Sequence, residues 1–118
     1  MAKQLVDHGV RCYILDGKNI IACDELTWAN WLQSDAENGT NLRSIRFEKI
    51  GDVDISTVFI GLDHNTLNNG PPHIFETMVF GGKYDGYMRR YSTYEEAEKG
   101  HEKAVKMVSE NLEQNDND

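Results

Sequence analysis

VDISTVFIGL, residues 53–62, is the stretch of sequence that decides the fold. β-Branched and aromatic side chains alternate along it from Val53 to Phe59, with the period of two that is typical of a strand. The second face becomes apolar near the end of the run, at Val58, Ile60 and Leu62. A strand with apolar residues on both faces is predicted to be central in its sheet and covered on both sides.

Further strands are predicted around this run, together with a short helix. The dipeptide Asp16-Gly17 between two β-rich runs is a strong hairpin signal. A short helix that contains Trp28 and Trp31 is expected over about residues 24–33. The remaining strands are expected at residues 11–16, 19–23, 42–50 and 74–80, and a short edge strand at residues 87–91.

The last predicted element is a helix over about residues 93–112. Thr93 and Glu96 match a capping box, in which each side chain bonds a backbone N–H that the first helical turn leaves without a partner. Gly100 lies inside this helix, where it costs about 1 kcal/mol relative to alanine. We therefore expect a strand or a bulky ring to approach the helix closely at Gly100. The apolar stripe consists of Ala97, Ala104, Val105, Val108 and Leu112.

This order of elements predicts a single α+β domain over residues 1–112. An antiparallel β-sheet of about five strands is expected, with the C-terminal helix and the short Trp-containing helix packed on it. Residues 113–118 are expected to form an acidic, frayed tail. Two helices are few for two sheet faces, so two alternatives stay open: a homodimer, in which a second protomer covers the exposed apolar face, and a monomer.

Composition disfavours several functional classes. Lys plus Arg is 12 and Asp plus Glu is 20, which gives a net charge of −8, whereas nucleic-acid binders present excess positive charge. Direct nucleic-acid binding is therefore not expected. No apolar run approaches the roughly 20 residues of a membrane span, and the first ten residues lack a signal-peptide core, so we expect a cytoplasmic protein without membrane contact. Cys12 and Cys23 flank the predicted hairpin and are expected to be reduced thiols.

The loop over residues 61–73, GLDHNTLNNGPPH, is the main candidate for a ligand-binding site. It joins the two most apolar strands and is longer than a tight turn requires. Polar side chains on a stiffened loop beside a rigid sheet are a common way to build a site. Alternatively, its Asp and Asn side chains cap their own backbone and its prolines restrict the chain. The candidate residues are Asp63, His64, Asn65, Pro71, Pro72 and His73.

Metal and catalytic roles receive less support from the sequence. Asp63, His64, His73 and Glu76 are suitable ligand types, but His73 and Glu76 on one strand would point to opposite faces. No metal site and no cofactor are therefore predicted. No Ser or Cys lies in a nucleophile elbow, so no catalytic residue is assigned. Glu76 is either a solvent-facing strand acid or a buried acid with a raised pKa.

Two further candidate ligand-binding residues lie outside the loop. Arg90 stands beside an aromatic residue and could clamp a phosphate or a carboxylate, or it balances the surplus of acidic groups. Alternation sends Arg89 to the opposite face, so at most one of the two arginines lines a given pocket. His101 lies on or beside the apolar stripe of the last helix, where it is either a packed histidine or a ligand.

Several segments together resemble a group of small proteins encoded by tailed phages and prophages, for which no activity is assigned. The resemblance covers roughly residues 53–105 and departs from the group's pattern at residues 66–69. It implies a cytoplasmic phage accessory protein and assigns no catalytic residue. The matching segments are STVFIGLDHN (56–65), GPP (70–72), FETMVFGG (75–82), RYSTYEEA (90–97) and GH (100–101).

The resemblance singles out residues that are far apart in the sequence. We therefore expect the loop over residues 63–73 to fold over the start of the last helix. Asp63, His64, Glu76 and His101 would then share a polar pocket, which is either a binding site or a satisfied structural network.

The expected function is that of a phage-encoded accessory protein that acts by binding a host protein or a small ligand, and so modulates host physiology or counteracts host defence. One alternative is a small metal-dependent or acid/base enzyme centred on His64, Glu76 and His101. Another alternative is a minor structural or assembly protein of the virion.

Overall fold

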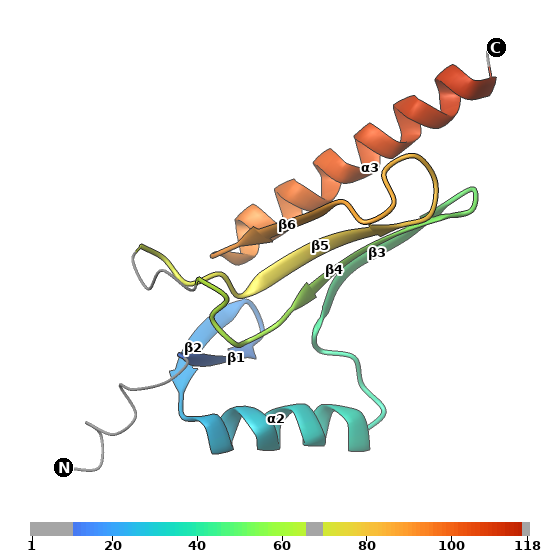
Figure 1. The fold of residues 1–118 in the computed structure, drawn as a ribbon. Coiled ribbons are helices and arrows are strands. Elements are labelled where there is room, and N and C mark those ends of the chain that lie inside the picture. The colour runs from blue at the N-terminus through green and yellow to red at the C-terminus, as the bar shows by residue number, and fades with distance from the viewer. Residues whose placement is uncertain (1–10, 66–69, 117–118) are drawn as a thin grey trace.

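The structure is a computed structural model that describes residues 11–65 and 70–116. Within these residues the chain forms a four-stranded antiparallel sheet, a separate two-stranded hairpin and two helices (Figure 1). The α+β class predicted from the sequence is confirmed. Along the chain the elements are β1 (Cys12–Asp16), β2 (Asn19–Cys23), α2 (Glu25–Glu37), β3 (Ser44–Ile50), β4 (Val53–Phe59), β5 (Phe75–Phe80), β6 (Met88–Tyr91) and α3 (Tyr94–Asp116).

The strands form two sheets, whereas the sequence predicted one. The larger sheet has the order β3-β4-β5-β6, so each strand pairs with its neighbour in sequence. β1 and β2 pair only with each other as a ladder. β1 reaches the chain beyond β4 through one isolated bridge, between Cys12 and Leu62, and through the hydrogen bond that the Tyr13 N–H donates to the Gly61 carbonyl. This contact is too short to extend the larger sheet.

α3 covers one face of the four-stranded sheet (Figure 1). β4 and β5 bury every second residue, as the alternating pattern of the sequence predicts. Ile55 and Val79 pack there against Ala104 and Val108 of α3. The prediction that β4 is central is confirmed, but the prediction that both of its faces are covered is wrong. Its other face, with Asp54, Ser56 and Val58, remains only partly buried.

The second part of the core lies where the hairpin and α2 meet the end of the sheet. Phe59 and Phe75 are fully buried there with Leu15 of β1. The ring of Trp31 in α2 meets Phe59 edge-on, with ring centroids 5.7 Å apart. Trp28 donates its indole N–H to the Ile60 carbonyl at 3.3 Å. The two tryptophans therefore anchor α2 to the end of β4, although this helix contacts few other elements.

Both helices begin at the predicted caps and run further than predicted. Asp24 accepts a hydrogen bond from the Thr27 N–H at 2.8 Å, and Thr93 and Glu96 form the capping box. α2 continues to Glu37 and α3 to Asp116, which places much of the predicted acidic tail in a helix; residues 117 and 118 lie outside the described residues. Among the helices that the structure describes, none has an apolar stretch long enough to cross a membrane.

The close approach expected at Gly100 is confirmed. A Cβ atom at this position would overlap the hydroxyl and ring atoms of Tyr91, which comes from the edge strand β6. Glycine therefore lets the phenol ring lie directly against the backbone of α3. This contact fixes the distance between α3 and the edge of the sheet.

Gly100→Ala is expected to destabilise the protein even though alanine is the better helix former. Alanine gains about 1 kcal/mol of helix propensity. Overpacking against Tyr91 costs about 1–3 kcal/mol and should outweigh this gain. Urea unfolding followed by circular dichroism should show a lower free energy of unfolding for Gly100→Ala, while Lys99→Ala on the exposed side of the same turn should be neutral. A more stable Gly100→Ala variant would contradict the packing described for Tyr91.

Candidate functional site

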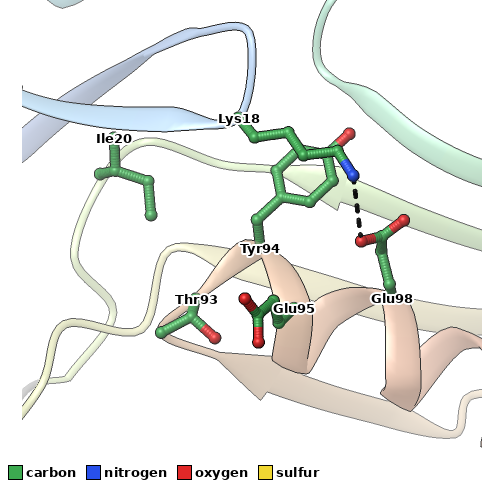
Figure 2. A pocket seen from close by; sticks show the side chains of 6 residues that line it. All are labelled: Lys18, Ile20, Thr93, Tyr94, Glu95 and Glu98. Atoms are coloured by element: carbon green, nitrogen blue, oxygen red, sulfur yellow. Dashed lines mark ion pairs between the residues drawn. The ribbon is translucent and has the colours of Figure 1, made fainter.

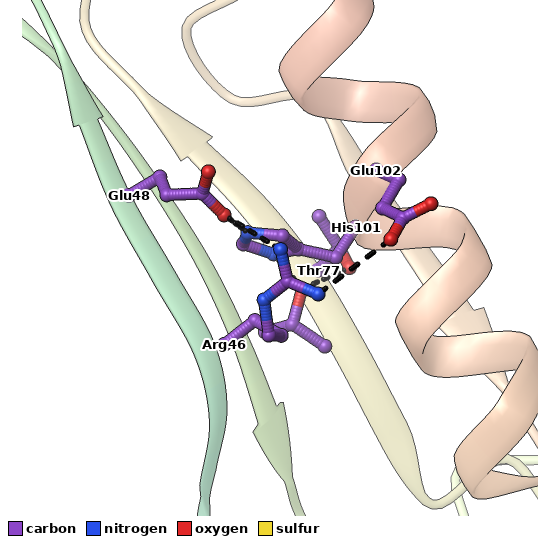
Figure 3. Close-up of polar contacts among 6 residues, drawn as sticks. Arg46, Glu48, Thr77, His101 and Glu102 are labelled. Carbon is purple, nitrogen blue, oxygen red and sulfur yellow. Dashed lines mark hydrogen bonds and ion pairs between the residues drawn. The ribbon is translucent and has the colours of Figure 1, made fainter.

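A buried polar cluster connects α3 to three strands of the sheet (Figure 3). We call Glu48, Thr57, Thr77 and His101 the His101 cluster. His101 is fully buried, and its Nδ1 atom lies 2.7 Å from the Thr57 hydroxyl. Its Nε2 atom lies 2.7 Å from Oε1 of Glu48. The hydroxyls of Thr57 and Thr77 are 2.5 Å apart. Of the two alternatives for His101, the packed histidine describes the structure: its ring has partners on β3 and β4, and Thr57 extends the cluster to Thr77 of β5.

The direction of the hydrogen bonds follows from the charge states. Burial lowers the pKa of His101, so the imidazole is neutral at pH 7 and carries one N–H. An ionised carboxylate only accepts, so Nε2 donates to Glu48 and Nδ1 accepts from the Thr57 hydroxyl. Thr57 in turn accepts from Thr77. The hydrogen bond from His101 and the neighbouring Arg46 both lower the pKa of Glu48, which keeps it ionised.

The outer end of the cluster carries a small ion-pair network. An Arg46 guanidinium nitrogen lies 3.2 Å from Glu48, and another lies 3.7 Å from Glu102 of α3. These groups are partly exposed, so water screens their charges and each pair stabilises little. Their main effect is to position the Glu48 carboxylate over the end of the buried imidazole.

The carboxylate, imidazole and hydroxyl are in the order that nucleophilic hydrolases use, but the cluster is closed. Thr57 would be the nucleophile, and it lies in the middle of β4 with no exposed surface. A substrate carbonyl cannot reach its hydroxyl, and a catalytic hydroxyl must contact the substrate. Every buried side-chain N and O atom among the described residues has a hydrogen-bond partner. The cluster is therefore a satisfied structural network.

Asp63 closes the candidate loop onto its own backbone. Its Oδ1 atom accepts hydrogen bonds from the Asn65 N–H at 2.8 Å and the His73 N–H at 2.9 Å. Its Oδ2 atom pairs with Arg11, whose Nε lies 2.8 Å away. Burial alone would raise the pKa of Asp63, but these hydrogen bonds outweigh it and lower the pKa. The alternative of a self-capping loop describes this segment.

The other candidate residues of the loop also form hydrogen bonds within it. The His64 N–H donates to the His73 carbonyl at 3.0 Å, and the Asn65 amide donates to the Pro71 carbonyl at 3.1 Å. Pro71 is exposed, whereas Pro72 and His73 are partly buried. The departure at residues 66–69 lies outside the described residues.

The expected shared pocket of Asp63, His64, Glu76 and His101 is not formed. Glu76 alternates with the buried Thr77 on β5, so it points to the sheet face opposite His101. There it forms an ion pair of 3.0 Å with Arg90 of β6, so these two candidates do lie together. Asp63 is held by Arg11 in the loop that follows β4. The resemblance led us to expect these residues in one pocket, but strand alternation and the hydrogen bonds within the loop hold them apart.

A cavity of about 390 Å³ lies between the tip of the hairpin and the start of α3 (Figure 2). The Lys18 ammonium lies 3.6 Å from a Glu98 carboxylate oxygen and 5.2 Å from the centre of the Tyr94 ring. Ile20, Thr93 and Glu95 complete the lining. The sequence analysis did not identify this cavity, because nothing local in the hairpin indicates which helix its tip contacts. Lys18 already occupies the position that a cationic ligand would take.

The face of the larger sheet that α3 leaves open carries an apolar patch, which the sequence analysis did not locate. Phe47, Phe80 and Met88 expose 56%, 48% and 41% of their surface. Strand register aligns Phe47, Ser56, Met78 and Met88 in one row across the four strands. We call this surface the uncovered face; it consists of Phe47, Lys49, Asp54, Ser56, Val58, Glu76, Met78, Phe80, Met88 and Arg90.

The charged groups of the uncovered face lie at two opposite corners. Lys49 and Asp54 form an ion pair of 3.1 Å at one corner, and Glu76 and Arg90 form the pair at the other. Two cations and two anions sum to zero, in a chain whose net charge is −8. The face therefore has an apolar centre and a neutral charged border.

Within residues 11–65 and 70–116, no group of three or more His, Cys, Asp or Glu side chains is placed to hold a metal ion. Comparison with known proteins identifies no matching family model, no matching curated protein and no matching solved structure.

His101 should make the stability of the protein fall as the pH is lowered through about 6.5. In the unfolded chain it titrates near its ordinary pKa of about 6.5, whereas burial lowers the pKa in the folded chain. Below pH 6.5 the unfolded state therefore binds the additional proton, and the free energy of unfolding falls as the pH falls. The loss is at most about 1.4 kcal/mol per pH unit for this one group.

Urea unfolding at several pH values measures this effect, with His101→Gln as the comparison. The variant should be less stable at pH 7.5 by about 1–3 kcal/mol, because it disturbs the buried hydrogen bonds. Its stability should also change less with pH than that of the wild type. Equal slopes for the two proteins would show that other groups cause the dependence.

Asp63→Ala should destabilise the protein by about 1–3 kcal/mol, because two backbone N–H groups and Arg11 lose their shared acceptor. His64→Ala is the matched control, since its bond to His73 uses the main chain and survives the substitution. Thermal unfolding of both variants measures the difference. Equal stability of the two variants would argue against the closure role of Asp63.

Proposed function

We propose that the protein is a phage-encoded accessory protein that acts by binding a protein of the host, and that the uncovered face is its binding surface. One observation carries this proposal: Phe47, Phe80 and Met88 are about half exposed on one sheet face. Large apolar side chains that are exposed together on one face are typical of interaction surfaces. The resemblance to phage and prophage proteins supports the viral origin and the host as the source of the partner.

The composition of the uncovered face favours a protein as the partner. Protein interfaces have an apolar centre that is rich in aromatic residues and Met, and a polar rim. Phe47, Met78 and Met88 form such a centre, and the two corner ion pairs form such a rim. A polyanion such as DNA or RNA would find no excess of positive charge on this surface.

The charge of the chain indicates what kind of protein would bind. At a net charge of −8, two copies of this chain repel each other, whereas a basic protein is attracted. The expected partner therefore has an apolar patch and a positive net charge. Association with such a partner should become faster at low ionic strength.

Binding is favoured over catalysis by the state of the polar side chains. His101 is fully buried, and Glu76 is on the other side of the sheet in an ion pair with Arg90. A reaction centre on His64, Glu76 and His101 would need these groups to converge on one accessible point. A role as a minor virion protein stays a prediction, and detection of the chain in purified particles would support it.

The variant Phe47→Thr/Met88→Thr should lose binding to the host partner while the fold is retained. Threonine keeps a high strand propensity and removes the exposed apolar surface. Loss of two interface side chains should weaken the Kd at least about tenfold. The partner is first captured from a host extract with the wild-type protein and is then purified, and calorimetry measures the Kd of each variant at low and moderate salt.

Leu26→Gln is the matched control, because Leu26 is 70% exposed but lies on α2, away from the uncovered face. It should bind like the wild type. Equal binding by the wild type and the Phe47→Thr/Met88→Thr variant would overturn the proposal. A wild-type homodimer that this double variant dissociates would also overturn it, because a second copy would then occupy the face.

A further inference from the structure

Cys12 and Cys23 lie directly opposite each other at the open end of the β1–β2 hairpin. The register runs from Asp16 opposite Asn19 at the turn to Cys12 opposite Cys23. No disulfide joins the two thiols in this structure. Cys12 is only 3% exposed, whereas Cys23 is partly accessible. The hairpin register therefore brings one buried and one accessible thiol together.

The backbone hydrogen bonds around Cys12 show whether Cys12 and Cys23 are a hydrogen-bonded or a non-hydrogen-bonded cross-strand pair. The Tyr13 N–H donates to the Gly61 carbonyl, and the Arg11 carbonyl accepts from the Asp63 N–H. Because consecutive residues of a strand direct their N–H and C=O groups to opposite sides, those of Cys12 point towards β2. Cys12 and Cys23 are thus a hydrogen-bonded pair, whose Cα atoms lie about 5.5 Å apart. This Cα separation is within the range that disulfides use, whereas the Cβ atoms of such a pair, about 5.5 Å apart, must approach each other by about 1 Å for the bond to form.

We propose that Cys12 and Cys23 are a redox-responsive pair that small-molecule disulfides oxidise to an intramolecular disulfide. The accessible Cys23 thiolate attacks one sulfur of the oxidant and releases its other half as a thiolate. Cys12 then loses its proton and attacks the Cys23 sulfur, which releases the second half. Two protein thiols lose two electrons and two protons, and the oxidant becomes two thiols.

The surroundings of the two thiols determine when this reaction occurs. Burial raises the pKa of both groups, and for Cys23 the adjacent Asp24 carboxylate raises it further. The thiolate is the nucleophile, so exchange is slow at neutral pH and faster at mildly alkaline pH. At neutral pH the two thiols should therefore stay reduced during a brief exposure to a disulfide oxidant and become oxidised only during a prolonged one.

The cross-link would stiffen the wall of the cavity at α3. It would close the segment from Cys12 to Cys23, whose tip places Lys18 against Tyr94 and Glu98. The same segment bridges to Leu62, next to the loop that Asp63 closes. Oxidation would thus limit the movement of the hairpin relative to both neighbours.

The test uses the full chain with oxidised glutathione at pH 8, followed by alkylation of the remaining thiols and intact-mass spectrometry. The expected product is a monomer that has lost two hydrogen atoms, accepts no alkylating group and carries no glutathione. Its melting temperature should rise by roughly 5–10 °C and return to the starting value after dithiothreitol.

Two variants distinguish the internal disulfide from simple thiol modification. Cys12→Ser should retain one glutathione on Cys23, because the second thiol that displaces it is absent. Cys23→Ser should form no cross-link and show no rise in melting temperature. Stable glutathione adducts on the wild type, or a disulfide-linked dimer without the internal cross-link, would overturn the proposal. The wild-type mass decides the question even if a variant fails to fold.

Discussion

The buried imidazole of His101 is the constraint on which the arrangement of α3 and the sheet depends. A buried polar group without partners costs about 1–3 kcal/mol, so both ring nitrogens must be satisfied. Their partners come from β3 and β4, and Thr77 of β5 completes the chain of hydroxyls. A slip of one residue in either strand pairing would turn Thr57 or Thr77 to the other face. The cluster therefore fixes both strand register and helix position.

Local signals in the sequence were sufficient to predict the elements. Alternation identified β4 and β5, because one buried face imposes a period of two on the strand. Thr93 and Glu96 located the start of α3, since capping depends only on residues three apart. Gly100 indicated a close neighbour, and Tyr91 is that neighbour. Each of these features is set by chain geometry over a few residues.

Partners that are distant in sequence could not be predicted in the same way. Glu48 and His101 are separated by 53 positions, and Asp63 and Arg11 by 52. Nothing near either residue specifies such a partner. The expected pocket of Asp63, His64, Glu76 and His101 is not formed for a different reason. The alternation that identified β5 places Glu76 and Thr77 on opposite faces of the sheet, and His101 lies on the face of Thr77. The position of His101 among the alanines of α3 was the signal that indicated the covered face.

Each face of the larger sheet carries some side chains that are unusual for their surroundings. The covered face buries a histidine and two threonines, whereas the other face exposes Phe47 and Phe80. Full burial of an aromatic or Met side chain contributes about 1.5–3 kcal/mol, so three half-exposed ones leave roughly 3 kcal/mol unused. The His101 cluster specifies the strand register and the position of α3, but it replaces apolar contacts between α3 and the sheet with polar ones. A chain of this size has little stability to spare. Exposed apolar side chains on one face of a sheet are therefore better explained by association, in which their burial contributes to binding, than by folding.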